Sequence, residues 1–77
     1  PEHRAEADAV RAFCAGDLPL YVEVGFDHGM RLLDHARRFP DARWLGVEIR
    51  RARVDAARPH APDNCFLLRG DARSVFA

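Results

Sequence analysis

The sequence contains no lysine, so all twelve of its basic residues are arginines, and twelve acidic residues bring the net charge to zero. A balanced charge gives no long-range attraction for a polyanion, which argues against a dedicated electrostatic nucleic-acid binder. Arginine suits bidentate phosphate contacts better than lysine does. Genomic base composition is nevertheless the simpler explanation for the bias.

Cysteines and long apolar runs are also scarce. The two cysteines, Cys14 and Cys65, lie far apart and neither belongs to a CxxC pair. Two thiols make no disulfide framework, and Cys65 lies in an apolar run typical of a buried, reduced residue. No apolar run approaches the about 18 residues of a membrane span, and no signal peptide is recognisable. These features predict a cytoplasmic location and no membrane partner.

The length of 77 residues allows one domain with a thin core, because a chain this short buries only about 60% of its unfolded surface. The apolar fraction of 48% excludes disorder as a description of the whole chain. The first residue is Pro1 rather than methionine. We therefore expect residues 1–77 to be the amino-terminal part of a single, longer domain.

Helical and strand patterns alternate along the chain. The spacing of apolar residues and the breakers predict helices at 2–16, 30–39 and 50–58, and strands at 20–24, 43–48 and 64–69. Continuous apolar strands that alternate with helices are typical of a parallel sheet covered on both faces. The predicted fold is therefore α/β, a Rossmann-like sheet truncated to about three strands.

Two helices carry recognisable inner faces. The buried face of the second helix is predicted to contain Leu32, Leu33, Ala36 and Phe39. The inner face of the third helix is mostly alanine, formed by Ala52, Ala56 and Ala57, which would allow the helix to approach a sheet closely.

Three acids fall at the carboxyl ends of the predicted strands, namely Glu23, Glu48 and Asp71. Ligands of open parallel sheets bind outside those ends, and right-handed crossovers would place all three ends on one edge. The pattern predicts a pocket for a ligand rich in hydrogen-bond donors. Capping of neighbouring amides is the alternative for Glu23, and N-capping of the last helix is the alternative for Asp71.

The turn after the first strand narrows the ligand class. Gly25 and Gly29 do not form the Gly-x-Gly-x-x-Gly pattern of dinucleotide folds, and no phosphate-binding loop of the GxxxxGK[ST] kind is present. A carboxylate just ahead of the turn would repel a phosphate. The turn therefore favours a cationic or zwitterionic ligand.

The run Glu23-Val-Gly-Phe-Asp-His-Gly29 resembles the first motif of class I S-adenosylmethionine-dependent methyltransferases. Together with "GVE" at 46–48 and "GDA" at 70–72, it is similar to the bacterial tRNA (guanine-N7)-methyltransferase family over roughly residues 20–73. The resemblance implies a cytoplasmic transferase of tRNA processing that uses S-adenosyl-L-methionine and tRNA. The cofactor-binding residues that it implies are Glu23, Gly25, Phe26, Asp27, Gly29, Glu48, Ile49, Asp71 and Ala72.

The resemblance also implies a role for each motif. Glu23 would orient the loop and the methionine end of the cofactor, and Glu48 would accept hydrogen bonds from the ribose hydroxyls. Asp71 would meet the adenine amino group, with the Ala72 amide near the ring. Ile49 would cover one face of the adenine. Gly25 and Gly29 would let the backbone pass close to the cofactor.

Two features depart from the family pattern. Asp27 stands at the family's middle glycine, where aspartate tolerates the left-handed backbone but its side chain could crowd the cofactor or repel the methionine carboxylate. The family's catalytic acid and most of its RNA contacts would lie beyond residue 77, so no catalytic residue is assigned and these 77 residues alone are expected to be inactive. A first strand left at a sheet edge would invite self-association.

Other functions stay open at this point. A non-catalytic, degenerate module with the same fold and a methyltransferase for another acceptor both fit the sequence. His28 and His35 lack a third ligand at metal-like spacing, so no metal site is predicted. Arg50, Arg51, Arg53 and Arg58 could touch RNA phosphates, although a solvated helix face is the more common explanation.

Overall fold

A computed structural model describes the backbone of residues 2–76 and the side chains of residues 6–76. Its elements are, in order, α1 (Glu2–Cys14), β1 (Leu20–Val24), α2 (Met30–Arg38), β2 (Arg43–Glu48), α3 (Arg51–Ala57), the 3-10 turn η1 (Arg58–His60), β3 (Cys65–Arg69) and α4 (Ala72–Val75). The first two strands have the predicted bounds, and the third begins one residue later than predicted. Pro59 lies inside η1, so α3 ends ahead of it as expected.

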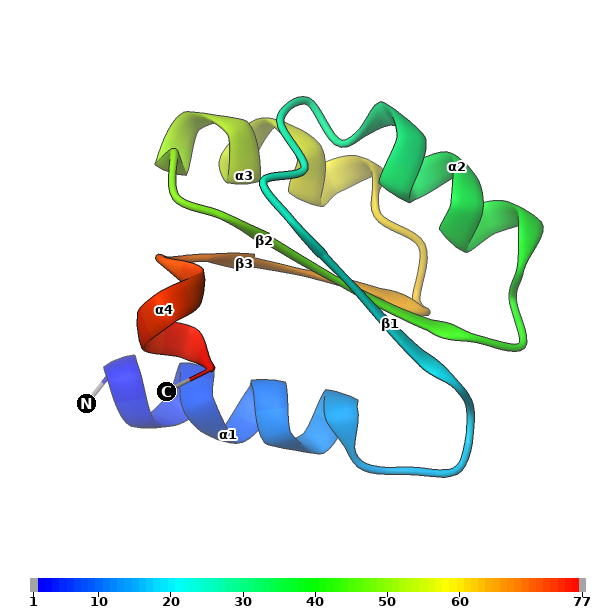
Figure 1. Ribbon diagram of the computed structural model, residues 1–77, viewed down its shortest axis with the longest axis horizontal. Helices are drawn as coiled ribbons and strands as arrows, with labels where there is room; N and C mark the ends of the chain where they lie inside the picture. Colours follow the sequence, from blue (N-terminus) through cyan, green and yellow to red (C-terminus); the bar gives the residue numbers. More distant parts are fainter. Residues whose placement is uncertain (1, 77) are drawn as a thin grey trace.

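The three strands form one parallel sheet in the order β1-β2-β3, with β2 in the centre. Figure 1 shows two helical layers, with α2 and α3 on one face of the sheet and α1 and α4 on the other. The predicted α/β class, with a parallel sheet and helices on both faces, is confirmed. None of the helices in residues 2–76 has the length and apolar character needed to cross a membrane.

The main core lies between the sheet and the layer of α2 and α3. It is formed by Phe26, Leu32, Leu33, Ala36, Val54, Ala57, Cys65 and Leu67. Gly46 of β2 lies beneath this layer, and a Cβ atom added there would stand 2.8 Å from Phe26 Cδ2 and 3.0 Å from Leu67 Cδ2. The absence of a side chain at Gly46 therefore lets α2 and the turn before it rest directly on the sheet. Burial also raises the pKa of the Cys65 thiol to about 11, which fits the predicted reduced core residue.

Two predictions about inner helix faces are wrong. Phe39 is 55% exposed, because α2 ends at Arg38 ahead of Pro40 and Phe39 leaves the helical conformation (φ −123°, ψ 72°). In α3, Val54 and Ala57 are the buried residues, whereas Ala52 and Ala56 are exposed. Of the three predicted alanines, Ala57 alone lies on the inner face, since α3 is turned so that the i, i+3 pair of Val54 and Ala57 meets the sheet.

The Arg43 side chain ties the sheet to the end of α1 and to the loop that follows it. The Arg43 guanidinium donates to the carbonyl oxygens of Phe13 (2.8 Å), Ala15 (3.0 Å), Gly16 (3.4 Å) and Leu18 (2.5 Å). The Phe13 ring also lies 5.4 Å from the ring of Phe66 in β3. Arg43 thus satisfies carbonyl groups that the end of a helix leaves without partners.

Candidate functional site

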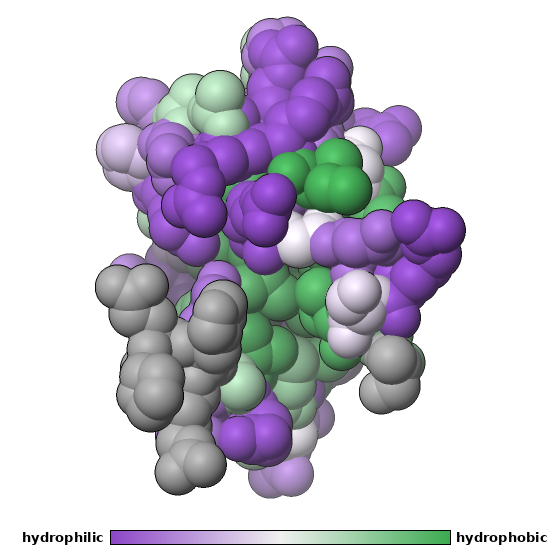
Figure 2. All heavy atoms as spheres, turned by 90° about the vertical axis from the view of Figure 1, so that its left-hand side faces the viewer, coloured by the Kyte–Doolittle hydropathy of each residue, from purple (hydrophilic) through white to green (hydrophobic). Residues whose placement is uncertain are grey.

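The carboxyl ends of the three strands meet at one edge of the sheet, as predicted. The Gly25 amide donates to the Val47 carbonyl (2.7 Å), and the Gly70 amide donates to the Glu48 carbonyl (3.0 Å). These bonds attach the loops that follow β1 and β3 to the end of β2. We call this edge, with the loops that follow the three strands, the rim. Figure 2 looks at this edge, where hydrophobic side chains reach the surface in the middle of the face, beneath a cap of hydrophilic ones.

Glu48 is the one charged residue among the buried residues of the described chain, with 3% of its surface exposed. Its Oε1 accepts from the Asp27 amide (3.0 Å) and from Arg50 Nη2 (3.2 Å). Its Oε2 accepts from the Arg50 amide and from Arg50 Nε, both at 3.0 Å. The side-chain hydrogen bond from Arg50, followed by those from the Arg50 and Asp27 amides, outweighs desolvation and lowers the pKa of Glu48 to about 2. Glu48 is therefore a fixed anion.

The turn between β1 and α2 needs left-handed backbone at three positions, namely Gly25 (φ 72°), Asp27 (φ 58°) and Gly29 (φ 80°). The expectation that aspartate would allow this turn to form is confirmed. A Cβ atom at Gly25 would meet nothing within 4 Å, so the backbone there borders open space. At Gly29 a Cβ atom would stand 3.4 Å from Ala57 Cβ, an ordinary contact distance, so the positive φ rather than close packing favours glycine there.

Asp27 is tied to the start of α3 by two arginines. Its Oδ1 lies 2.9 Å from Arg50 Nη2 and 3.4 Å from Arg53 Nε. Arg53 Nη1 also lies 2.8 Å from both ring nitrogens of His28. The carboxylate at the position of the family's middle glycine is thus paired with two positive charges and is not an isolated negative charge.

Glu23 lies on the same face of the sheet as Glu48, since it pairs in register with Gly46, two residues before Glu48 in β2. Its side chain is 27% exposed, and its Oε1 lies 3.3 Å from Arg31 Nη2 of α2. Most of the surface of Arg31 is exposed. Glu23 is therefore partly accessible from solvent and only loosely paired.

Asp71 caps α4, which was the alternative reading of this residue from the sequence. Its side chain accepts from the Arg73 amide (2.9 Å), and its two oxygens also accept from Arg73 Nε (3.1 Å) and Nη2 (2.7 Å). The side-chain hydrogen bond from Arg73 is the main cause that lowers the pKa of Asp71 to about 2. Any ligand of Asp71 would have to share the carboxylate with these donors.

The remaining predicted residues lie in different surroundings. Ile49 is 54% exposed at the rim, and its carbonyl accepts from Arg69 Nε (3.2 Å). Ala72 is the first residue of α4. The Phe26 side chain belongs to the core, so Phe26 can offer only its backbone to a ligand.

Arg50 is the member of this rim that sequence reasoning missed. The arginine was grouped with the solvated helix face, whereas its side chain bridges Glu48 and Asp27. The signal in the sequence is an arginine two residues after the predicted ribose-binding acid, together with an acid where the motif has a glycine. Arg58, from the same group, donates to the Leu67 carbonyl (3.3 Å).

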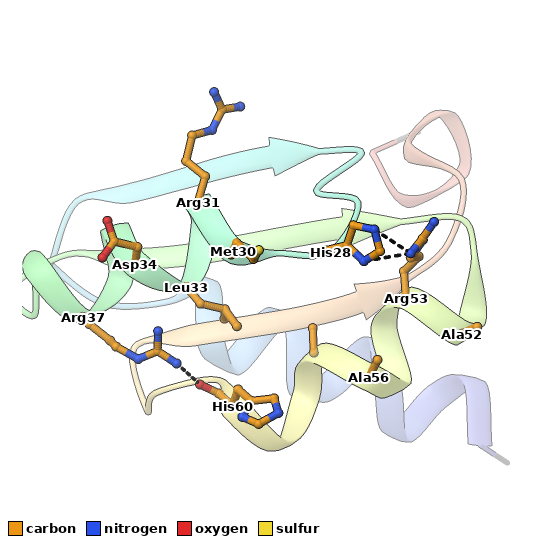
Figure 3. Close-up of a pocket in the computed structure, with 11 residues that line it drawn as sticks. His28, Met30, Arg31, Leu33, Asp34, Arg37, Ala52, Arg53, Ala56 and His60 are labelled. Atoms are coloured by element: carbon orange, nitrogen blue, oxygen red, sulfur yellow. Dashed lines mark hydrogen bonds between the residues drawn. The ribbon is translucent and has the colours of Figure 1, made fainter.

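A cavity of about 800 Å³ lies elsewhere, between α2 and α3. Figure 3 shows that arginine and apolar side chains line it together, with Arg53 reaching His28 and Arg37 donating to the His60 carbonyl (2.8 Å). It contains none of the three strand-end acids, so the rim and not this groove is the candidate site.

Within residues 6–76, no group of three or more His, Cys, Asp or Glu side chains could hold a metal ion. No buried polar side-chain atom of these residues lacks a hydrogen-bond partner.

Comparison with known proteins identifies the family. Residues 17–77 match a family model described as "Putative methyltransferase". The chain belongs to this methyltransferase family. Among curated relatives, a tRNA (guanine-N(7)-)-methyltransferase from Leifsonia xyli subsp. xyli is 40% identical over 75% of this chain. One from Treponema pallidum subsp. pallidum is 34% identical over 97% of it.

A solved structure agrees with the family assignment. It is the SAM-bound structure of an amino pentose methyltransferase from Micromonospora echinaspora, which is 33% identical, covers 94% of this chain and superposes with a TM-score of 0.58. This chain spans only 27% and 31% of the two tRNA enzymes and 29% of the solved chain. The match therefore concerns one part of each of these proteins.

Proposed function

We propose that residues 1–77 supply the S-adenosylmethionine-binding part of a methyltransferase domain, and that the full-length protein methylates N7 of guanine in tRNA. The observation that carries the proposal is the buried, ionised Glu48 at the carboxyl end of β2, beside a glycine turn of the methyltransferase motif. The names of the curated relatives support the tRNA acceptor. A cytoplasmic location would suit that acceptor.

The residues at the rim fit such a cofactor. Glu48 would hold the ribose hydroxyls, and the open space at Gly25 would let the backbone approach the cofactor closely. The partly exposed carboxylate of Glu23 is a suitable partner for the ammonium group. The exposed side chain of Ile49 would cover the adenine, whose amino group would lie near Asp71.

The cofactor, when bound, would supply an electrophilic methyl group on its sulfonium. The residues of this chain would bind and orient it, which is the main requirement of the transfer. No residue of the chain is assigned to the acceptor. We therefore expect the 77 residues to bind the cofactor without methylating bulk tRNA. Incorporation of labelled methyl groups into tRNA by the purified chain would contradict this expectation.

Calorimetry with S-adenosylhomocysteine tests the binding function. We expect saturable heat with the wild-type chain and at least about tenfold weaker binding after Glu48→Gln, because the substitution replaces a charged acceptor by a neutral group. Asp55→Asn is the matched control, since it removes one exposed acid from α3 and leaves the rim unchanged.

Circular dichroism must first establish that each variant is folded. A folded wild-type chain that gives no heat at millimolar ligand would reject cofactor binding. It would support the second candidate function, a non-catalytic module with the methyltransferase fold. The observation that favours this candidate is Asp27, whose carboxylate stands at the family's middle glycine and is fixed there by Arg50 and Arg53. A different acceptor is a further possibility, since the solved neighbour acts on an amino pentose.

We also propose self-association through the edge of β1. Within the described residues β1 pairs with β2 on one side, and Tyr21, Val22 and Val24 expose about half of their surface. An exposed apolar edge strand is a template for pairing with another chain. Light scattering after gel filtration should detect concentration-dependent oligomers that Val24→Lys reduces and Ser74→Lys does not. A monomer at all concentrations would contradict this.

A further inference from the structure

The Glu48 carboxylate has its acceptor positions filled by four donors of the protein itself. A carboxylate offers about four lone-pair positions, and here each oxygen accepts one main-chain amide and one nitrogen of the Arg50 side chain. The two amides, of Asp27 and Arg50, are fixed by the turn and by the start of α3. The Arg50 side chain is 52% exposed. The two donors from the Arg50 side chain could therefore be replaced by donors of a ligand, whereas the two amides could not.

The two Arg50 donors match a vicinal diol, because each set presents two neighbouring hydrogen-bond donors to the two oxygens of the carboxylate. Arg50 Nε and Nη2 present two parallel N–H donors, one to each carboxylate oxygen, at 3.0 and 3.2 Å. The two hydroxyls of a ribose would donate to the same two oxygens. Both sets of donors cannot occupy these positions together.

The Arg50 side chain has a second acceptor close by. Its Nη2 lies 2.9 Å from Asp27 Oδ1, and the Asp27 side chain is 55% exposed. If the guanidinium left Glu48, it could stay paired with Asp27 outside the buried position. The buried Glu48 carboxylate would then keep its acceptor positions filled, because the diol would donate to the two oxygens that the guanidinium leaves.

We propose that the Arg50 guanidinium competes with the ribose diol of the cofactor for Glu48, with Asp27 receiving the guanidinium when the diol binds. Arg50 thereby sets the affinity of the site. This inference rests on the proposed function, because it assumes that Glu48 holds the ribose. In this proposal Asp27, which stands where the family has a glycine, serves as the acceptor for the displaced guanidinium.

Calorimetry with S-adenosylhomocysteine on the whole 77-residue chain tests the competition. Arg50→Met keeps the length of the side chain and removes its donors, and should bind the ligand about five- to tenfold more tightly than wild type. Arg50→Lys retains a single point donor and should fall between the two. Arg51→Met, which changes the exposed neighbouring arginine, should leave the affinity unchanged.

A diol-lacking ligand provides a second readout. The gain from Arg50→Met should disappear with the 2′,3′-dideoxy analogue of the same ligand, because that analogue does not compete for the two oxygens. If Arg50→Met fails to fold, as judged by circular dichroism, the comparison of Arg50→Lys with wild type decides.

The outcomes separate this inference from the proposed function. Binding by the wild-type chain with no gain in the folded Arg50 variants overturns the inference alone. An equal gain with the dideoxy analogue also overturns it. No saturable binding by the wild type or by any folded Arg50 variant rejects both the proposed function and the inference.

Discussion

At the scale of single residues, Gly46 is the glycine at which an added side chain would be most crowded. This glycine lies at the middle of the central strand, where α2 and the turn before it rest on the sheet. Interiors are packed as densely as organic crystals, so a single added methyl group has to displace its neighbours. Leu32, Phe26 and Leu67 surround the position where a Cβ atom would be added, with Leu32 Cδ2 the nearest.

Gly46→Ala should therefore lower the free energy of unfolding by about 1–3 kcal/mol, the usual cost of overpacking a core. Urea denaturation followed by circular dichroism measures the change. Gly70→Ala is the control, because the added methyl group would meet a single contact, Val75 Cγ2 at 3.0 Å, and should cost less. A Gly46→Ala variant as stable as wild type would show that the core relaxes around the methyl group.

At the scale of the elements, α1 depends on one side chain for much of its attachment. Arg43 reaches back from β2 to four carbonyl groups at the end of α1 and in the following loop. Hydrogen bonds from a charged donor contribute about 1.5–3 kcal/mol when they are buried, and less when they are exposed. The hydrogen bonds of Arg43 and the contact between the Phe13 and Phe66 rings thus both join the end of α1 to the sheet.

Arg43→Met should release α1 before the rest of the fold. We expect amide hydrogen exchange in residues 2–19 to become faster, while the amides of β2 and β3 keep most of their protection, with a total loss of about 1–3 kcal/mol. Arg38→Met is the control, because Arg38 pairs only with the exposed Asp34 of its own helix among the described contacts. Uniform loss of protection across all strands would contradict this partial release.

The sequence predicted where the helices and strands lie along the chain. It did not predict which side of α3 faces the sheet. Apolar runs predicted the strands at 20–24 and 43–48, although only the second of them is largely buried in the structure. The exposure of Ala52 and Ala56 depends on how α3 is turned against the sheet, which small residues leave undetermined. The failure at Phe39 has a local cause, since the residue before a proline avoids the helical conformation.

For the candidate site, the sequence predicted the edge of the sheet on which it lies but not the side-chain pairs within it. Motif spacing placed Glu23, Glu48 and the glycine turn at one edge, because parallel strands end on the same side. The pairing of Arg50 with Asp27 joins residues 23 positions apart. The contacts of Arg43 span 25 to 30 positions. Contacts of this range depend on the tertiary structure and leave no periodic trace in the chain.

At the scale of the whole molecule, acid should destabilise the fold through two carboxylates. The pKa of Glu48 falls from an ordinary 4.5 to about 2, chiefly through the side-chain hydrogen bond from Arg50, and that of Asp71 falls from 3.8 to about 2. A carboxylate with a lowered pKa in the folded state stabilises the protein above its ordinary pKa. That stabilisation is lost as the pH falls through the folded-state value.

We therefore expect the Tm to stay level between about pH 7 and pH 5 and to fall between about pH 4.5 and pH 2. Thermal melts by circular dichroism measure this dependence. Glu48→Gln should flatten the fall in this window, whereas Asp55→Asn, an exposed acid of α3, should not. A Tm that is constant down to pH 2 would exclude the two carboxylates as the acid-sensitive groups.

The end of β2 links the three loops at the carboxyl edge. Its main chain accepts from Gly25 and Gly70, and the Glu48 side chain accepts from the amides of Asp27 and Arg50. Loops connected in this way cannot fluctuate independently. A molecule that grips any one of them would restrict the motion of all three. The conformational entropy lost on binding would then be distributed along the entire rim rather than concentrated at the point of contact.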